Sequence, residues 1–337
     1  MLTLHGEINI LTNYMDSDKI NTSNFDYEKF SSILDAARRK SKKHDYYCCI
    51  PGCNKKALNH SHIIPQSALK KYICNDNNML IQCQIDEIHP MSTYKTGEIP
   101  FEKFHTIGIN GAMSLPLFCN EHDNDLFCQY EKDADGAEPY EVRFQVLQSL
   151  RATCALKHYN TKLLIQGQHK SSIDDFYLGY IYEEDQKLSQ NIINRCNSTI
   201  SALYQSIVTN NFSPYVFVCI ELELLKLAVC DVLYDDADLE TDKCDGPLNV
   251  LFINLIPKNN HSYLILGYDK RYISNKLKDK MEEWVCTLKE GLNIKTLYDI
   301  LCHCGNIWCI SPDCDSRIIE YLKNNYSEKR IETLFDF

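Results

Sequence analysis

Hydrophobic and polar positions divide the chain into regions of different periodicity. Residues 27 to 43 carry apolar side chains at helical spacing on one side and a basic run at the end. Two longer stretches within residues 133 to 210 repeat apolar side chains every three or four positions. We predict that they form two long helices packed as an antiparallel hairpin. Their apolar positions are Phe144, Leu147, Leu150, Cys154 and Ala155, then Phe176, Tyr180, Leu188, Ile192, Cys196, Ile200, Leu203 and Ile207.

Beyond Pro214 the pattern changes to short runs rich in β-branched and aromatic residues, which is typical of strands. The runs are residues 215 to 222, 250 to 256 and 263 to 268, and a hairpin loop is predicted at 257 to 261. Helical patterns return at residues 271 to 290, 293 to 301 and 315 to 324. We therefore predict an α+β domain over residues 211 to 337, with a small sheet and helices.

Paired cysteine and histidine residues distinguish the region before the hairpin. Three residues separate Cys49 from Cys53, and two separate Cys119 from His122. Thiolates and imidazoles at such spacings close tetrahedral zinc sites, so these four residues are predicted to bind a structural Zn²⁺. Neighbouring residues of the same kinds offer alternative ligands, which are Cys48 in place of Cys49, and His60 or His62 in place of His122.

A strand hairpin carrying the first pair and a helix start carrying the second would form a treble-clef (ββα-like) module over residues 46 to 132. The two pairs are too far apart for a compact zinc finger, so we predict an insertion at residues 74 to 112, which contain turn-forming sequences. Residues 1 to 45 are left as an N-terminal segment with the basic helix. The predicted fold class is α+β.

At these residues the chain resembles the HNH, or His-Me finger, endonucleases. In that family a zinc-stapled treble clef often carries a His-Ile-x-Pro segment after the first Cys pair, matched here by residues 62 to 65. A metal ligand follows the second pair, where this chain has Asp123. The resemblance implies that His62 is a general base acting on water, and that Asp123 helps to hold a catalytic Mg²⁺ or Mn²⁺.

This chain departs from the family pattern at two positions. The family usually has an acid or a second His where this chain has Ser61, and a His where it has Asp123. The family often has an Asn as well, for which Asn110 is the candidate. The ligand that is missing here could be replaced by Asp125, Glu121 or Glu131.

A second resemblance covers most of the chain. Its matching segments are residues 49 to 53, 118 to 131, 150 to 152, 254 to 257 and 305 to 312. It is to a scattered group of bacterial zinc-finger-like proteins that are suspected of roles in defence against phage. This resemblance implies an architecture and a role in antiviral defence rather than a mechanism.

Charge is distributed unevenly. The net charge is −11, yet residues 26 to 72 carry ten basic and four acidic residues, a local balance of +6 that leaves −17 for the rest. Such a basic segment attracts phosphate, whereas the acidic remainder repels it. We predict that nucleic acid binds through residues 26 to 72, although a solvated helix face is the alternative reading. The predicted phosphate ligands are Arg38, Arg39, Lys40, Lys42 and Lys43.

Seventeen cysteines without a recognisable export signal or membrane-spanning run indicate reduced thiols in a cytoplasmic protein that does not bind membranes. A cluster near the end can bind a second metal ion or form a packed turn, and we favour packing. Its members are Cys302, Cys304, Cys309 and Cys314. No Gly-rich phosphate loop, nucleophile elbow or dinucleotide fingerprint occurs.

Together these observations predict a metal-dependent HNH-like endonuclease acting on DNA or RNA. The alternative is a non-catalytic zinc-binding protein whose C-terminal domain recognises a protein partner or ligand.

Overall fold

The structure of the chain is a computed structural model, which describes residues 27–83, 104–131, 138–170, 176–235, 246–304, 308–317 and 319. Within these ranges the chain forms seven α-helices, one π-helix and a seven-stranded antiparallel sheet, with a separate two-stranded ladder. The predicted α+β fold class is confirmed.

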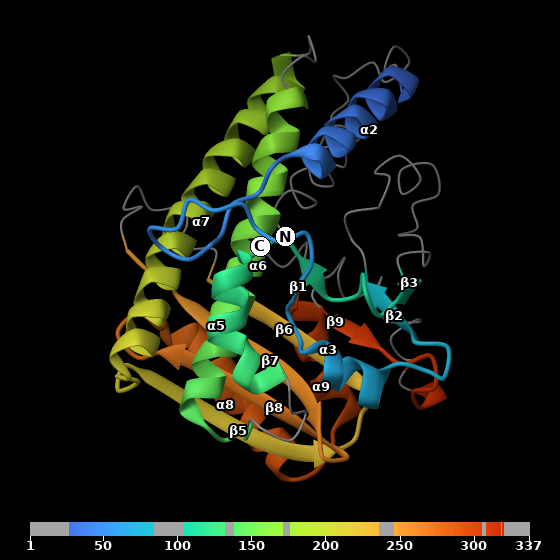
Figure 1. Cartoon of the computed structure of the whole chain (residues 1–337), viewed down its shortest axis with the longest axis vertical. Helices are drawn as coiled ribbons and strands as arrows, with labels where there is room; N and C mark the ends of the chain where they lie inside the picture. Colours follow the sequence, from blue (N-terminus) through green and yellow to red (C-terminus); the bar gives the residue numbers. More distant parts are fainter. Residues whose placement is uncertain are drawn as a thin grey trace, which may run out of the picture.

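The seven-stranded sheet lies at the centre of the fold (Figure 1). Its strands are β2 (Met79–Cys83), β3 (Phe104–Gly108), β5 (Tyr215–Glu223), β6 (Leu227–Tyr234), β7 (Val250–Lys258), β8 (His261–Asp269) and β9 (Trp308–Ile310). They are ordered β3-β2-β9-β6-β7-β8-β5. Asn259 and Asn260 join β7 to β8 with φ angles of 50° and 62°. Two consecutive positive φ values are those of a type I′ turn, whose twist matches that of a hairpin.

Helices cover both faces of the sheet. The helices α6 (Val142–Lys170) and α7 (Phe176–Thr209) pack on one face, and α8 (Asn275–Lys289) and α9 (Ile294–His303) pack on the other (Figure 1). Because side chains alternate along a strand, each central strand serves two hydrophobic cores. In β7, for example, Phe252 packs on the α6 side and Ile253 packs on the α8 side.

The predicted helical hairpin corresponds to α6 and α7, which lie side by side and extend beyond the sheet (Figure 1). Every residue of α6 from Phe144 to Leu156 is buried, so this half of the helix is covered all round. Its hydroxyl side chains bond to the helix itself: Ser149 Oγ donates to Gln145 O at 2.9 Å, and Thr153 Oγ1 donates to Ser149 O at 2.8 Å. Such bonds allow polar residues to be buried in a helix without outside partners.

The helix α2 (Tyr27–Lys43) packs beside the outer part of α6 (Figure 1). Gln166 Nε2 donates a hydrogen bond of 3.1 Å to Ser41 Oγ, and Ser41 is buried. The basic end of α2 is therefore fixed to the part of the hairpin that extends away from the sheet.

The sheet unites segments that the sequence assigns to different domains. The predicted insertion at residues 74 to 112 contributes β2 and β3, and the C-terminal region contributes β9. Ile81 in β2 pairs with Ile310 in β9, and Gln82 pairs with Cys309. The insertion thus anchors the metal-binding region to the C-terminal part of the fold.

Most predicted elements of the C-terminal region have counterparts in the structure. The strands β5, β7 and β8 and the helices α8 and α9 lie where the sequence predicts them. The strand β6 is not predicted, and the helix predicted at 315 to 324 lies mostly outside the described residues. None of the described helices combines the length and the apolar content needed to cross a bilayer.

The contact of Phe217 with Gly267 generates a prediction about stability. A Cβ atom added at Gly267 would lie 2.0 Å from Phe217 Cδ1 on the neighbouring strand. We expect Gly267→Ala to lower the free energy of unfolding by about 1–3 kcal/mol, the range for overpacked interiors. Denaturant titration measures the change.

Gly108→Ala is the matched control, because a Cβ there would meet only Met79 Sδ at 3.9 Å. Adding Phe217→Leu should return part of the stability lost in Gly267→Ala. Equal stability losses at Gly267 and Gly108 would show that the ring of Phe217 is not the constraint.

Candidate metal centre

The first half of the site is a tight loop of residues 46–58, which we call the knuckle. The N–H of Cys48 donates to Lys55 O at 2.9 Å, and the N–H of Cys53 donates to Ile50 O at 3.1 Å. Gly52 has φ 76°, a conformation that glycine adopts without a steric penalty. These bonds turn the chain sharply enough to bring two cysteine side chains onto one side.

The second half of the site is the start of the helix α5 (Asn120–Glu131). A short ladder of β1 (Ser61–His62) and β4 (Ser114–Leu115) leads into this helix. Two backbone bonds join the knuckle to the segment between β4 and α5: Cys49 N–H to Leu117 O at 2.8 Å, and Leu58 N–H to Phe118 O at 2.7 Å. Cys119 immediately precedes the helix and His122 lies in its first turn, and both side chains face the knuckle.

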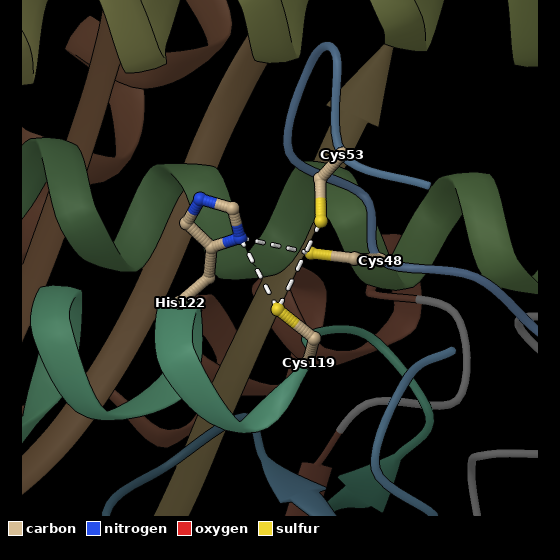
Figure 2. A group of neighbouring side chains, drawn as sticks. All are labelled: Cys48, Cys53, Cys119 and His122. Atoms are coloured by element: carbon tan, nitrogen blue, oxygen red, sulfur yellow. Dashed lines mark hydrogen bonds between the residues drawn. The ribbon is translucent and has the colours of Figure 1, made fainter. Parts of the chain in front are cut away.

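Four side chains converge between these two halves (Figure 2). They are Cys48, Cys53, Cys119 and His122, and their ligand atoms all lie within 4.8 Å of one another. His122 Nδ1 lies 3.4 Å from Cys48 Sγ and 3.3 Å from Cys119 Sγ, and the Sγ atoms of Cys53 and Cys119 are 3.9 Å apart.

These separations match the edges of a zinc tetrahedron. Bonds of about 2.3 Å to sulfur and about 2.0–2.1 Å to nitrogen place tetrahedral ligands about 3.8 Å apart for two sulfurs and about 3.6 Å apart for sulfur and nitrogen. Three thiols and one imidazole nitrogen are also the donor set that zinc prefers. The group can hold a metal ion such as zinc.

The charge state of the sulfurs depends on a cation. Burial raises the pKa of Cys48 to about 12. Burial also opposes ionisation of Cys119, but the N–H group of His122 and the thiols of Cys53 and Cys48 outweigh it, so the pKa of Cys119 is lowered. A divalent cation would let the three sulfurs be thiolates together, as in other cysteine metal sites.

The structure corrects one predicted ligand. Cys48, not Cys49, lies in the group, so the ligand spacing is Cys-x4-Cys. Neighbouring residues of an extended segment point to opposite sides. Cys49 consequently faces α6, where it is buried and hydrogen-bonds to Cys154; this bond and the charge of Lys157 lower the Cys49 pKa despite burial. The alternative ligands His60 and His62 do not belong to the group.

An ion pair on the surface connects the two halves of the site. Lys55 of the knuckle pairs with Glu121, which lies between the two ligands of α5. Both side chains are more than half exposed, at 58% and 64%, so this pair contributes little to stability compared with the backbone bonds.

His62, the predicted base, lies in β1 opposite Ser114 and is partly buried. Its Nε2 atom lies 3.3 Å from the carbonyl oxygen of Ile109. Since a carbonyl only accepts, Nε2 must carry the proton in this contact, and Nδ1 of the neutral ring then has a lone pair.

Ser61 has a structural role that the sequence does not reveal. It is fully buried, and its Oγ accepts the N–H of Phe118 at 3.3 Å. The hydroxyl thereby holds the strand that precedes Cys119. The other two candidates near His62 are exposed: His60 contacts Ser114 Oγ, and Asn110 accepts a bond from Gln66.

Asp123 follows His122 in the first turn of α5 and is partly buried. Among the described residues, the Cys3His set is the one group of three or more Cys, His, Asp or Glu side chains arranged to hold an ion. Neither His62 nor Asp123 belongs to it, and they form no second group of that size. Glu121 and Asp125 are exposed on the same helix.

The predicted phosphate ligands lie at the C-terminal end of α2. Arg39, Lys40, Lys42 and Lys43 are exposed, and Arg38 is half-buried. Four residues separate Lys43 from Cys48 along the chain, so the backbone between them spans at most about 17 Å. The basic end of α2 therefore lies within that distance of the first ligand.

The second cysteine cluster does not form a metal site in the described part of the chain. Cys304 is buried in the core on the α8 side of the sheet, and Cys309 in the core on the α6 side. Cys314 Sγ donates to Leu225 O at 3.3 Å. The side chain of Cys302 lies outside the described residues.

Comparisons with known proteins provide no relative. No protein-family model matches the chain, and neither the curated proteins nor the solved structures contain a significant match. Functional inference therefore depends on the residues themselves.

The different positions of Cys48 and Cys49 generate a prediction about metal content. We expect the purified protein to contain zinc, and Cys48→Ser to lose most of it and to melt at a lower temperature, because a hydroxyl is a much poorer zinc ligand. Elemental analysis and thermal melts with and without a chelator measure both effects.

Cys49→Ser is the matched control, since it changes the adjacent thiol on the other side of the chain. It should keep the zinc content of the wild type. Zinc loss in Cys49→Ser with retention in Cys48→Ser would contradict the ligand assignment.

Proposed function

We propose that the chain is a zinc-stapled, HNH-like nuclease that hydrolyses phosphodiester bonds in DNA or RNA with Mg²⁺ or Mn²⁺. In this proposal the knuckle, the β1–β4 ladder and α5 form a treble clef whose zinc is structural. His62 is the general base, and Asp123 is a ligand of the catalytic cation.

The contact between His62 and Ile109 is the observation that carries this proposal. A general base must present an unprotonated nitrogen near neutral pH, and imidazole does so when its other nitrogen donates to a fixed acceptor. The Ile109 carbonyl provides that acceptor at 3.3 Å. His62 is only partly buried, as a residue that acts on a substrate water must be.

The order of elements also supports the proposal. His62 ends the first strand of the ladder, and the second strand leads directly to the helix that carries Asp123. A single carboxylate is sufficient for a hard cation of this kind, because Mg²⁺ commonly keeps several waters and takes its other ligands from substrate phosphate. The buried hydroxyl of Ser61 is then not required as a ligand.

The basic end of α2 supports nucleic acid as the substrate class. Four exposed cations lie next to the knuckle, whereas the rest of the chain outside residues 26 to 72 has a net charge of −17. Polyanions are therefore attracted to the basic end of α2, which precedes the knuckle. Antiviral defence, which the second sequence resemblance implies, is the biological role that we attach to this activity.

A non-catalytic role is the second candidate, and one observation favours it. The described residues contain no second group of three or more metal-ligating side chains around His62 and Asp123. In that case zinc only stabilises the fold, and the C-terminal part recognises a protein partner or ligand.

Cleavage assays distinguish the two candidates. We expect Mg²⁺- or Mn²⁺-dependent cleavage of DNA or RNA by the wild type, and a loss of about a hundredfold or more in His62→Ala, as for removal of a general base. Asp123→Ala should raise the cation concentration needed for cleavage. Gel assays of plasmid DNA and structured RNA measure the rates.

His60→Ala is the matched control, because His60 is an exposed histidine two residues away that contacts Ser114. It should keep its activity, and all three variants should keep their zinc. Cleavage that is equal in the wild type and His62→Ala, or absent from all proteins, would rule out the proposed roles and favour the non-catalytic function.

Substitutions in α2 test nucleic-acid binding separately from cleavage. The double variant Lys42→Glu and Lys43→Glu should bind both DNA and RNA more weakly and show a shallower dependence of affinity on salt, because fewer counterions are released. Fluorescence anisotropy over a salt series measures both quantities.

The control is Lys289→Glu with Lys295→Glu, which reverses two exposed charges near α8 and α9. It makes the same change in net charge away from α2. Equal weakening by the two double variants would show that only net charge matters, and that α2 is not the binding surface.

A further inference from the structure

The strand β5 forms one border of the sheet. It pairs with β8 along its whole length, and no other described strand pairs with it (Figure 1). At nine residues it is long for a border strand, and it contains no Pro or Lys to discourage further pairing. Its central side chains, from Val216 to Cys219, are only half-buried. As far as the described residues show, the outer backbone groups and apolar side chains of this border are therefore able to pair with another strand.

The sequence of β5 is suited to pairing with itself. Cys219 is the middle residue of Tyr215–Glu223. An antiparallel pair centred on Cys219 places Phe217 opposite Glu221 of the second copy, and Tyr215 opposite Glu223. No like charges then face each other, whereas centring the pair on Glu221 would oppose two carboxylates, which is destabilising. The register centred on Cys219 is therefore favoured, because it pairs all nine residues of the strand and opposes no like charges.

The two ends of the strand have opposite charge. Glu221 and Glu223 are exposed at the C-terminal end of β5. At the other end, the N–H of Lys270 donates to Pro214 O, and Lys270 and Arg271 are both exposed. Asp269 pairs with Arg271 and leaves a net positive charge there. In an antiparallel pair the acidic end of each copy meets the basic end of the other.

From these features we propose that two copies of the chain join through β5, antiparallel about a two-fold axis at Cys219, to form a continuous sheet. Each copy supplies the same residues, as in an isologous interface. The half-exposed side chains on both faces, such as Val218 and Phe217, become covered by their symmetry mates. Backbone bonds along the strand provide the pairing, as in other cases of strand addition.

Sedimentation velocity over a micromolar concentration series tests this interface. The wild type should shift from monomer to dimer as its concentration rises. Cys219→Lys should remain monomeric, because it sets two lysines opposite each other on the axis, while the long side chain keeps its charge in water. Cys286→Lys, at an exposed cysteine of α8, is the control and should dimerise like the wild type. Circular dichroism verifies that each variant is folded.

A charge swap tests the register. Glu223→Lys alone and Lys270→Glu alone should each raise the dimer dissociation constant about tenfold, because the two-fold axis repeats each contact. The combined swap should restore the affinity of the wild type. Additive weakening in the combined variant would overturn the charge pairing.

Copper-phenanthroline oxidation gives an independent result. Two cysteines opposite each other in an antiparallel pair have Cα atoms about 4.5–5.5 Å apart, within the range that a disulfide spans. The dimer should therefore acquire a Cys219 to Cys219 cross-link, identified by peptide mass spectrometry. A wild type that stays monomeric over the whole concentration series, or a dimer that persists in Cys219→Lys, overturns the proposal. In the first case β5 is not a self-association surface.

Discussion

The organisation of the chain depends on one constraint, the burial of α6 by elements from distant parts of the sequence. Five residues of α6, spaced three to eight apart, contact the sheet, α5, the knuckle and α2. The backbone oxygen of Gln148 accepts from Cys230 Sγ in β6, and Arg151 lies over the ring of Phe127 in α5. Cys154 and His158 contact Cys49 and Tyr46 of the knuckle, and Gln166 contacts Ser41 of α2. Because a helix is rigid over this length, it fixes these elements relative to one another.

A metal ion at the Cys3His group would therefore act locally. Structural zinc contributes about 10–16 kcal/mol in isolated zinc-finger peptides, which do not fold without it. Here the knuckle is also held by backbone bonds to residues 117 and 118 and by its contact with α6. The hydrophobic core on the α6 side extends into the knuckle and includes Cys48, Cys49 and Cys119, whereas the core on the α8 side contains none of the four ligands. Metal loss should consequently loosen the knuckle and α5 while the sheet remains folded.

The sequence predicts elements with a clear period and misses those whose pattern has another cause. Amphipathic helices and alternating strands are found near their predicted positions, but β6 is buried over six consecutive residues and has no alternation to recognise. The pairing of β2 with β9 joins segments that are more than two hundred residues apart, which no local pattern encodes. Spacing alone also does not decide whether Cys48 or Cys49 is the ligand, because a loop of three or of four residues before Cys53 can close around a metal ion. Only the side of the chain that faces α6 distinguishes them.

The hairpin of α6 and α7 gives the molecule an electrical polarity. The 29 residues of α6 extend over about 43 Å, with the exposed cations of α2 beside its outer part and the acidic majority of the chain elsewhere. Opposite charges held apart on a rigid support form a large dipole moment. The electric field of a polyanion would rotate the molecule before contact, so that α2 faces the polyanion. Salt would then weaken orientation during diffusion as well as affinity after contact.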